Sequence, residues 1–240
     1  MPETQLHEID LLGETVEYEV RYSSEATKPR IDVDIHTVTV VLPESHERSP
    51  HQILSDNAAW VVEKIREYDK YREQAPEREF GEGELFPYLG EPHEVAVEQR
   101  PSSSVVDGEF RLAKHHVSNT SIKRALETLY RRNARRQFER RADRLAEAMG
   151  VEYDQIEIRN QRTRWGSCST NGTLGLNWRL MMSPPEIIDY IIIHELAHLR
   201  EANHSPEFWS LVAEYDPDYE SHAEWLTENS ARLIFSKDDL

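Results

Sequence analysis

The most constraining feature of the sequence is an apolar run that leads directly into a cluster of polar residues. Residues 187–193 read IIDYIII, and residues 194–204, HELAHLREANH, hold three histidines and two glutamates. Such an apolar run predicts burial, whereas burying an unpaired charge is costly. The fold therefore has to provide partners for these polar groups, and a bound metal ion is one such partner.

The apolar run carries the start signals of an α-helix. Residues 183–186, SPPE, place prolines at the start and negative charge in the first turn, which predicts a helix over 185–200. With 3.6 residues per turn, His194 and His198 project from one face, one turn apart, and can reach one tetrahedral zinc ion. Glu195 lies about 100° around the helix from His194, a position that suits handling a bound water rather than binding the metal.

A third histidine follows at a position where the chain is expected to turn. Asn203 tolerates the left-handed conformation that ends helices, and residues 205–207, SPE, offer a cap, a proline and a carboxylate for a new helix. His204 would then be held between two helix ends as the third ligand. The alternative is a pair of core histidines and a surface glutamate on an amphipathic helix. If the third ligand lies elsewhere, the candidates are Glu214, Glu220 and His222.

Two segments resemble the YgjP-like zinc metallopeptidases, which are related to the SprT-like proteases. They are IIDYIIIHELAHLREANHSPEFW and, upstream of it, TRWGSCSTNGTLGLNWRL. FPYLGEPHEVAV and WVVEKIREY show a weaker similarity, so the resemblance covers most of residues 15–235. It implies a zincin-type peptidase with one zinc ion on His194, His198 and His204, and with Glu195 as the base. The histidine spacing also matches the metzincins, but Glu201 stands where those enzymes have a glycine and no methionine-turn signature follows.

The expected chemistry follows from the ligand set. Three neutral imidazoles leave zinc with a net +2 charge and one open position for water, whose pKa falls from about 15.7 to about 7. Glu195 would take a proton as water attacks the scissile carbonyl and deliver it to the leaving amine. A second donor to the oxyanion is expected, for which Tyr219 and His222 are candidates; packing or surface exposure is the alternative for both.

Residues 155–165 and 173–180 are predicted to pair as a β-hairpin, because residues 169–172, STNG, favour a turn between them. The edge of this hairpin would bind an extended peptide beside the metal. The substrate contacts are then expected at Leu176, Asn177 and Trp178. Packing against the metal-binding helix is the alternative and can hold at the same time. The single cysteine, Cys168, is interpreted as a small packed side chain.

The charge of the chain is strongly negative. There are 28 basic and 45 acidic residues, a net charge of −17, and only six of the basic residues are lysines. A carboxylate-rich, lysine-poor surface suits a cytoplasm at very high salt, where charge repulsion is screened. We therefore hypothesise a halophilic source, with an acidic mesophilic protein as the alternative. The single cysteine and the lack of a membrane-spanning stretch predict a soluble cytoplasmic protein.

Basic residues concentrate between residues 101 and 164, which hold 14 Lys/Arg against 9 Asp/Glu. Many lie on one long helix predicted over residues 121–150, where arginines recur at every fourth position: Arg132, Arg136, Arg140 and Arg144. This stripe is either a solvated face neutralised by carboxylates or a surface that binds nucleic-acid phosphates. Phosphate binding would fit two further functional classes: a nucleic-acid-associated binding module, or a protease acting on nucleic-acid-bound proteins. The metal site by itself leaves a third class open, a hydrolase of non-peptide amides.

The overall pattern predicts an α+β fold in two parts. Residues 1–117 form a β-rich N-terminal region with one helix, and residues 118–240 form a mainly helical domain with the hairpin beside the metal helix. The family resemblance implies that this second part is a zincin-like metallopeptidase domain. The segments expected in the first part are strands over 16–23, 30–35, 37–43, 93–99 and 109–117, a helix over 51–74 and a loop over 77–92. The sequence contains no recognisable internal repeat.

Overall fold

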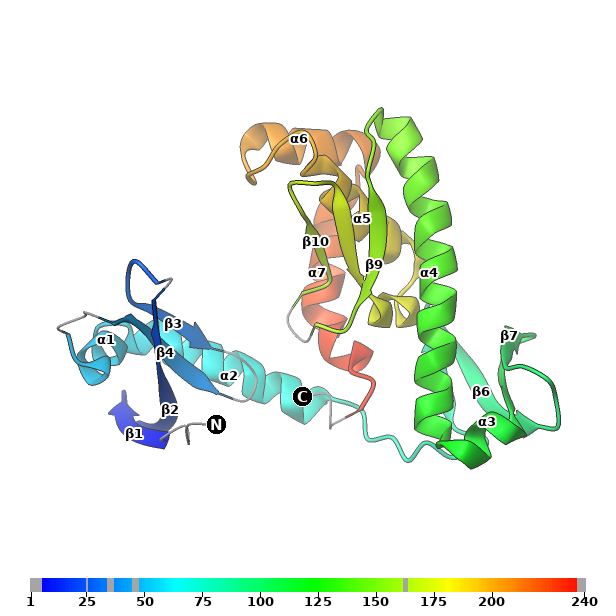
Figure 1. Cartoon of the computed structure of the whole chain (residues 1–240), viewed down its shortest axis with the longest axis horizontal. Coiled ribbons are helices and arrows are strands. Elements are labelled where there is room, and N and C mark those ends of the chain that lie inside the picture. The colour runs from blue at the N-terminus through cyan, green and yellow to red at the C-terminus, as the bar shows by residue number, and fades with distance from the viewer. Residues whose placement is uncertain (1–5, 25, 34–36, 45–47, 162–163, 237–240) are drawn as a thin grey trace. The chain divides into compact units, whose positions relative to one another are not determined.

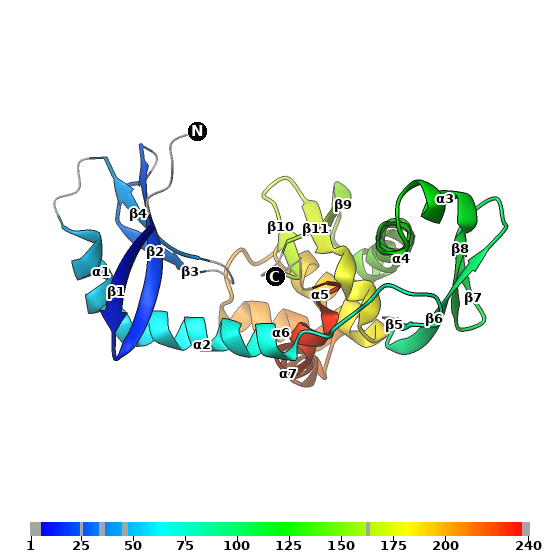
Figure 2. The ribbon, with the colours of Figure 1, turned by 90° about the horizontal axis from the view of Figure 1, so that it is seen from below.

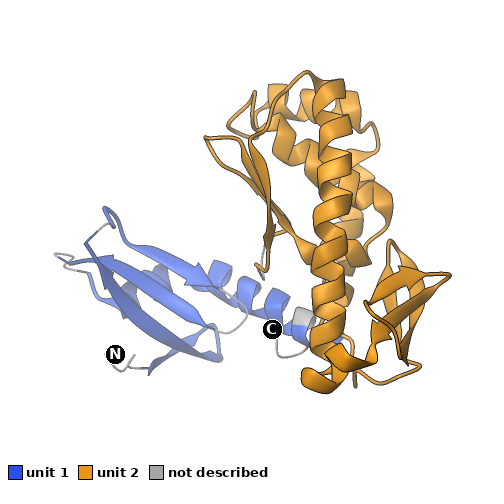
Figure 3. Cartoon of the chain, turned by 45° about the vertical axis from the view of Figure 1, so that its right-hand side comes forward, with its two compact units in different colours: residues 1–75, 240 blue, residues 76–239 orange. Residues whose placement is uncertain are grey.

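The computed structural model describes residues 6–24, 26–33, 37–44, 48–161 and 164–236. It confirms the predicted α+β class, with a β-rich N-terminal part and a mainly helical C-terminal part (Figure 1). The described residues form two compact units, one up to Ala75 and one from Pro76 onward (Figure 3). The division falls after Ala75 rather than between residues 117 and 118 as predicted, because the strands that precede residue 117 share the core of the second unit.

Unit 1 is a four-stranded sheet with two helices. The strands are β1 (Leu6–Leu11), β2 (Glu14–Ser23), β3 (Arg30–Val33) and β4 (Val38–Pro43), in the order β1-β2-β4-β3. Helices α1 (Pro50–Asp56) and α2 (Ala58–Gln74) contact this sheet (Figure 2) and complete a separate core around Val40, Leu54 and Val61. Strand β1 was not predicted, and the predicted helix over 51–74 is interrupted at Asn57, whose side chain donates a hydrogen bond to the carbonyl of Ile53. The end of the strand predicted over 30–35 lies outside the described residues.

Unit 2 begins with a second four-stranded sheet. Its strands are β5 (Leu85–Tyr88), β6 (Glu91–Glu98), β7 (Ser104–Val106) and β8 (Glu109–Ala113), in the order β5-β6-β8-β7. The predicted loop over 77–92 therefore contains β5 and the start of β6. The prolines and glycines of this segment are compatible with the strands. Pro87 on the edge strand β5 lies opposite Pro92 on β6, and Gly90 has a φ of +85° in the turn between the two strands. The strand predicted over 109–117 ends at Ala113, and helix α3 (Lys114–Asn119) follows.

The long basic helix is confirmed as α4 (Ile122–Met149), which Figure 1 shows passing from the second sheet to the third. Its bounds follow from local chemistry. The Ser121 hydroxyl accepts a hydrogen bond from the Arg124 backbone N–H, and Gly150 ends the helix with a left-handed φ of +63°. One face, including Leu129 and Phe138, is buried in the main core.

The third sheet has the strand order β10-β11-β9. Strand β9 (Gln155–Arg159) runs parallel to β11 (Thr173–Asn177), whereas β10 (Gly166–Cys168) pairs with β11 as an antiparallel hairpin. The predicted pairing of residues 155–165 with 173–180 is therefore confirmed between β9 and β11 but wrong in orientation: these two strands are parallel, and the turn at 169–172 joins β10 to β11. Residues 162–163 of the predicted strand lie outside the described residues.

The remaining elements surround the apolar run. A 3₁₀ turn η1 (Trp178–Met182) leads into helix α5 (Pro185–Ala197), which contacts α4, α6 (Pro206–Tyr215), α7 (Tyr219–Asn229) and β10. The last described element is a 3₁₀ turn η2 (Ser230–Leu233). Helix α5 stops at Ala197, earlier than the predicted residue 200, and is buried on most sides, as the apolar run predicts. Among the described helices, none has the length and apolar character needed to span a membrane.

Candidate metal centre

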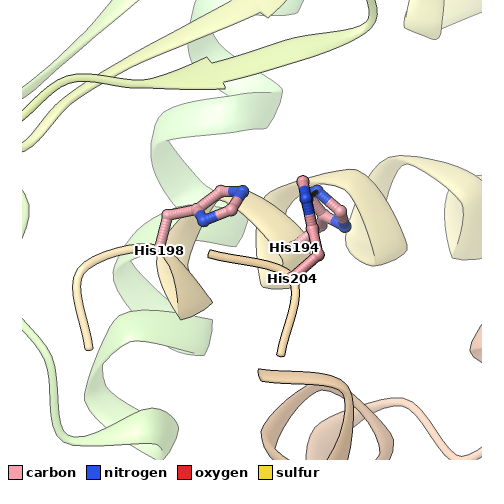
Figure 4. Close-up of side chains that lie close together, drawn as sticks. All are labelled: His194, His198 and His204. Atoms are coloured by element: carbon pink, nitrogen blue, oxygen red, sulfur yellow. Dashed lines mark hydrogen bonds between the residues drawn. The ribbon is translucent and has the colours of Figure 1, made fainter. Parts of the chain in front are cut away.

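Three histidines meet at the C-terminal end of α5. His194 lies in its last turn, His198 is the residue after its last turn, and His204 comes from the loop before α6 (Figure 4). One ring nitrogen of each lies within 4.8 Å of the others, and the Nε2 atoms of His194 and His204 are 3.1 Å apart. Two nitrogens bound tetrahedrally to one zinc ion at about 2.0–2.1 Å would be roughly 3.3 Å apart. The donor set therefore fits one metal ion.

The return of the chain to His204 follows from two helix ends close together. The backbone N–H groups of residues 199–201 bond to the last carbonyls of α5, which closes its final turn. The predicted cap of the next helix is confirmed, because the Ser205 hydroxyl accepts a hydrogen bond from the Phe208 N–H at 3.3 Å. His204 therefore lies between two fixed backbone segments, which holds its ring near the other two.

The hydrogen bonds of the ring nitrogens select the metal-binding tautomer. Nδ1 of His198 lies 3.1 Å from the carbonyl oxygen of Glu201. Because a carbonyl only accepts, Nδ1 carries the proton and Nε2 is left with a free lone pair. Nδ1 of His194 is buried without a partner in the described part of the chain. An imidazole buried in this way has one nitrogen to offer, and its Nε2 is the one that faces His204.

The electrostatic environment keeps these imidazoles neutral. Burial lowers the pKa of His194 to about 4, and the neighbouring His198 and His204 add to the effect. Burial also lowers the pKa of His198, although the hydrogen bond to the Glu201 carbonyl partly opposes the change. Neutral imidazole is the form that binds a metal, so near pH 7 the buried ligands are already in the required state.

Glu195 is buried against the backbone of β10. Only 5% of its surface is exposed, and a Cβ atom on Gly166 would lie 2.7 Å from Cγ of Glu195. Position 166 therefore has to be glycine for the carboxylate to occupy its place. Burial raises the pKa of Glu195 to about 7, and the charge of Arg164 partly opposes this. A carboxylate with a pKa near neutrality can both accept and return a proton.

A cavity of about 410 Å³ opens in front of these groups. It is bounded on one side by the three histidines and Glu195, and on the other by the segment that forms β10 and the turn after it. The residues contributed by that segment are Arg164, Gly166, Ser167, Cys168, Ser169 and Thr170. Sequence reasoning missed Arg164, Gly166 and Ser167, although all three belong to the TRWGSCS segment that supported the family resemblance. Cys168 is a free, half-buried thiol whose pKa is raised by burial and by the charge of Glu195.

The two predicted oxyanion donors do not line this cavity. Tyr219 stacks on Trp209 with ring centroids 5.4 Å apart, and its hydroxyl donates to Glu220 at 3.2 Å. His222 is hydrogen-bonded to Asp216 at 2.8 Å, and the Tyr190 ring lies beside both His222 and His194. Their role in catalysis stays a prediction. The alternative third ligands, Glu214, Glu220 and His222, are not part of the described metal-binding cluster.

The substrate contacts predicted at Leu176 and Asn177 on β11 and at Trp178 in η1 need correction. Strand β11 is the central strand of its sheet, paired on both sides, so it offers no free edge. Leu176 and Trp178 are fully buried, and Asn177 is 3% exposed. Asn177 instead uses its side-chain N–H groups to bond the carbonyl oxygens of Gln161 at 2.6 Å and Arg164 at 3.2 Å. All three side chains are therefore buried rather than presented to a substrate, and Asn177 supports the loop beside the cavity. The outer strands of the sheet are β9 and β10, of which β10 lines the cavity.

The arginine stripe on α4 is exposed along its length. Arg144 pairs with Asp189 at 2.9 Å, Arg140 donates to Gln137 at 2.5 Å, and Arg132 donates to the carbonyl of Ser103. Each of these contacts leaves other donor groups of the guanidinium available, since arginine has five. Binding of nucleic acid by the stripe therefore stays a prediction.

Comparison with known proteins identifies the family of the chain. The family model described as YgjP-like, metallopeptidase domain, matches residues 27–229, which include the histidine triad and the cavity. The chain belongs to the YgjP-like metallopeptidase family. As a YgjP-like metallopeptidase it requires a metal ion, and the three histidines are the described group that could hold one.

Two solved structures resemble part of this YgjP-like chain. The metallopeptidase zymogen abylysin of Pyrococcus abyssi is 25% identical, with a TM-score of 0.37 over 40% of this chain and 96% of its own. The metallopeptidase zymogen jannalysin of Methanocaldococcus jannaschii is 22% identical, with a TM-score of 0.35 over 38% of this chain and 88% of its own. No curated protein shows significant similarity to the sequence.

Proposed function

We propose that this metallopeptidase is a zinc enzyme that cleaves peptide bonds with Glu195 as the general base. One observation carries the proposal: three imidazole nitrogens converge within 4.8 Å beside a buried glutamate that faces the same cavity. Nitrogen ligands from three histidines favour zinc, and a fourth position open to the cavity is typical of catalytic rather than structural zinc sites. A bound zinc ion supplies Lewis acidity and lowers the pKa of a bound water.

The roles of the protein groups follow from their places. His194, His198 and His204 hold the metal through neutral imidazoles. Glu195 accepts a proton from the water that attacks the scissile carbonyl and later returns it to the leaving amine. Burial against Gly166 fixes the carboxylate, and burial raises its pKa to about 7. A group with this pKa is basic enough to hold the proton until the leaving amine accepts it.

The substrate is best placed along the outer edge of β10. In the described part of the third sheet, this strand pairs only with β11, so its other edge has backbone N–H and C=O groups available for an extended peptide. The same strand lines the cavity and touches Glu195 through Gly166. A peptide added to this edge would therefore bring its backbone carbonyls next to the base.

The direct test is metal analysis combined with a hydrolysis assay. The purified protein should contain about one zinc per chain, as three convergent imidazoles imply. It should cleave an unfolded protein substrate, lose the activity on treatment with a chelator, and regain it when zinc is returned. Assays at low and at molar KCl cover the possibility that this acidic chain needs salt to fold fully. A zinc-loaded, folded protein that cleaves no peptide bond at either salt concentration would overturn the proposal.

A further inference from the structure

Arg164 is a cation in the cavity that forms no ion pair with a described residue, although its charge acts on Glu195. It lies just before β10, lines the cavity with Glu195, and is exposed. Within the described ranges, no carboxylate lies within ion-pair distance of it, whereas Arg141 and Arg144 on α4 both pair with Asp189. Among the described residues that line the cavity, Glu195 is the only carboxylate, and it is packed against Gly166 instead of forming an ion pair with Arg164.

The backbone that carries Arg164 is held in place by the buried side chain of Asn177. The Asn177 amide donates to the carbonyl oxygens of Gln161 and Arg164, and its backbone N–H donates to the carbonyl of Trp165 at 2.9 Å. These bonds join the loop to the central strand of the sheet, so the guanidinium projects from a fixed position. A fixed backbone reduces the conformational entropy that the side chain loses when it binds a ligand.

The chemistry of the cavity wall indicates what this guanidinium binds. The neighbouring Ser167, Ser169 and Thr170 add hydroxyl groups, which also donate hydrogen bonds. A guanidinium presents a planar pair of N–H groups that matches a carboxylate, and such charge-assisted pairs are stronger than neutral hydrogen bonds. The wall thus offers donors and one positive charge to a negatively charged group close to the reacting carbonyl.

We infer that Arg164 binds a carboxylate of the peptide substrate next to the scissile bond and thereby sets the substrate preference. The inference rests on the proposed peptidase function. Two sources provide this carboxylate: an aspartate or glutamate side chain that flanks the scissile bond, or the C-terminal carboxylate of a short peptide.

The test uses matched internally quenched peptides and the full-length zinc-loaded protein in molar KCl, where long-range repulsion from the chain's net charge is screened. One series has an amidated C-terminus and carries Glu, Gln or Lys at each position flanking the scissile bond. A second series carries only Gln and differs in a free or amidated C-terminus. The values of kcat and KM are measured for the wild type, Arg164→Gln and Arg164→Lys. The control is Arg200→Gln, which removes the same charge from an arginine that bonds the Gly150 carbonyl and does not line the cavity.

The wild type should show a KM about tenfold to a hundredfold lower for the peptides with a suitably placed carboxylate than for their neutral partners. Arg164→Gln should abolish this difference, Arg164→Lys should retain part of it, and Arg200→Gln should leave it unchanged. A preference in the first series assigns the carboxylate to a side chain, and a preference in the second assigns it to the C-terminus. Equal kcat/KM for all peptides would overturn the inference while the peptidase function stands. The inference would also be overturned if Arg164→Gln lowered kcat equally for all peptides, because the residue would then act on the reaction and not on substrate preference.

A binding measurement separates this inference from the peptidase proposal. Titration calorimetry with the zinc-loaded Glu195→Gln protein reports the affinity for the same peptides without cleavage. The carboxylate peptides should bind about tenfold to a hundredfold more tightly than the neutral ones, and the double variant Arg164→Gln/Glu195→Gln should lose that preference. Absence of the preference in Glu195→Gln contradicts the inference even if the wild type cleaves no peptide at all.

Discussion

The first sheets of the two units have the same architecture. In unit 1 the order is β1-β2-β4-β3 and in unit 2 it is β5-β6-β8-β7, and in both the successive pairings are antiparallel, parallel and antiparallel. A short helix and then a long helix follow each sheet. Even the first turn is the same: Leu12-Gly13 has φ values of +54° and +86°, and Leu89-Gly90 has +52° and +85°. The chain thus contains a structural repeat that the sequence analysis did not detect.

The two copies differ in what their first turn contacts. Leu12 is 68% exposed, and a Cβ atom on Gly13 would meet nothing within 4 Å. In the second copy the Leu89 N–H donates to the Met181 carbonyl at 2.8 Å, and a Cβ atom on Gly90 would lie 3.1 Å from Cα of Pro184. The second turn therefore supports the start of α5, the helix that carries His194 and Glu195. The same backbone turn is exposed in unit 1 and packed against the segment that precedes α5 in unit 2.

Their surroundings differ as well. Residues 1–75 contain 16 acidic and 8 basic residues, against 29 and 20 in residues 76–240, so unit 1 has the higher density of negative charge. Unit 1 also holds a cavity of about 570 Å³, larger than the one at the metal centre, and the described residues along its wall include the carboxylates of Glu8, Glu14, Glu17 and Asp69 but no histidine. Size alone does not mark a catalytic site; convergent nitrogen ligands and a buried base do. Changes in unit 1 should therefore affect stability and leave the reaction intact.

The largest difference between the units is expected in catalysis. Glu195→Gln should retain zinc and the fold but lower kcat by a factor of about 10²–10⁴, because only proton transfer is removed. The matched change in unit 1 is Arg66→Gln, which breaks the ion pair with Glu14, and it should leave kcat within about twofold. Peptide hydrolysis and bound zinc are measured for both variants. Undiminished turnover in Glu195→Gln would falsify the mechanism proposed here.

Metal affinity should show the next largest effect. His204→Ala removes one of three convergent ligands and should weaken zinc binding at least a hundredfold, more than the 10–100-fold typical of losing a group that only supports a ligand. Zinc retention is measured against a competing chelator of moderate affinity. His222→Ala is the control, because the described hydrogen bond of His222 is to Asp216. If His204→Ala retained full zinc and His222→Ala lost it, the third ligand would be misassigned.

The pH dependence of stability of the metal-free protein should report the burial of Glu195 in unit 2. Its pKa in the folded state, about 7, lies above the value of 4.5 expected in the unfolded chain. Stability from this group is therefore present below about pH 4.5 and is lost as the pH rises through 7. Relative to the wild type, metal-free Glu195→Gln should gain up to roughly 3 kcal/mol of unfolding free energy between pH 4 and pH 8. Denaturant titrations that report on unit 2 measure this gain; a constant difference between the two proteins across that range would show that the carboxyl group is not perturbed.

Substituting the glycine of each repeated turn compares the two units directly, and we expect changes in unfolding free energy of about the same size as the pH effect at Glu195. Alanine at either glycine has to adopt a positive φ, which costs about 1–2 kcal/mol. Gly90→Ala should cost roughly 1 kcal/mol more than Gly13→Ala, because its Cβ also meets Pro184. It should in addition lower hydrolysis by displacing the start of α5. Thermal unfolding and hydrolysis rates are compared for the two variants. Equal losses of stability, with equal activities, would mean that the second turn supports α5 no more than the first.

The smallest effect is expected from the arginine stripe. If it binds duplex DNA, log affinity should fall with log salt at a slope of about −0.9 per phosphate contact, and Arg136→Gln/Arg140→Gln should reduce the slope by about two. The charge-matched control in unit 1 is Arg66→Gln/Arg72→Gln. We expect no measurable binding at molar salt and little at low salt, because the net charge of −17 repels DNA. Fluorescence anisotropy with a labelled duplex measures this, and a steep salt slope that only the stripe variant reduces would show the surface to be functional.

The features that could be predicted from the sequence depend on residues close together along the chain. The spacing of His194 and His198, the cap at Ser205 and the bounds of α4 are set by helix geometry and by side chains within four residues, so the pattern is sufficient. Unit 1 shows the limit of this approach, because β1 and the break at Asn57 left no strong local pattern. The first turns of the two repeated sheets both read LGE, at residues 12–14 and 89–91, but so short a match does not by itself reveal that the strand order is shared.

The pairing of strands and the composition of the cavity were decided only by the tertiary structure. Contacts between residues far apart in the chain decide which segments pair with β11, which strands lie at the edges of the sheet, and which residue lies beside Glu195. Local sequence preferences do not separate these arrangements from the alternative pairings. The sequence by itself determined the three histidines, the glutamate between the first two and the helix that presents them. Only the folded chain placed Gly166 against that glutamate and Arg164 in the cavity in front of it, since close packing selects one arrangement that no local pattern encodes.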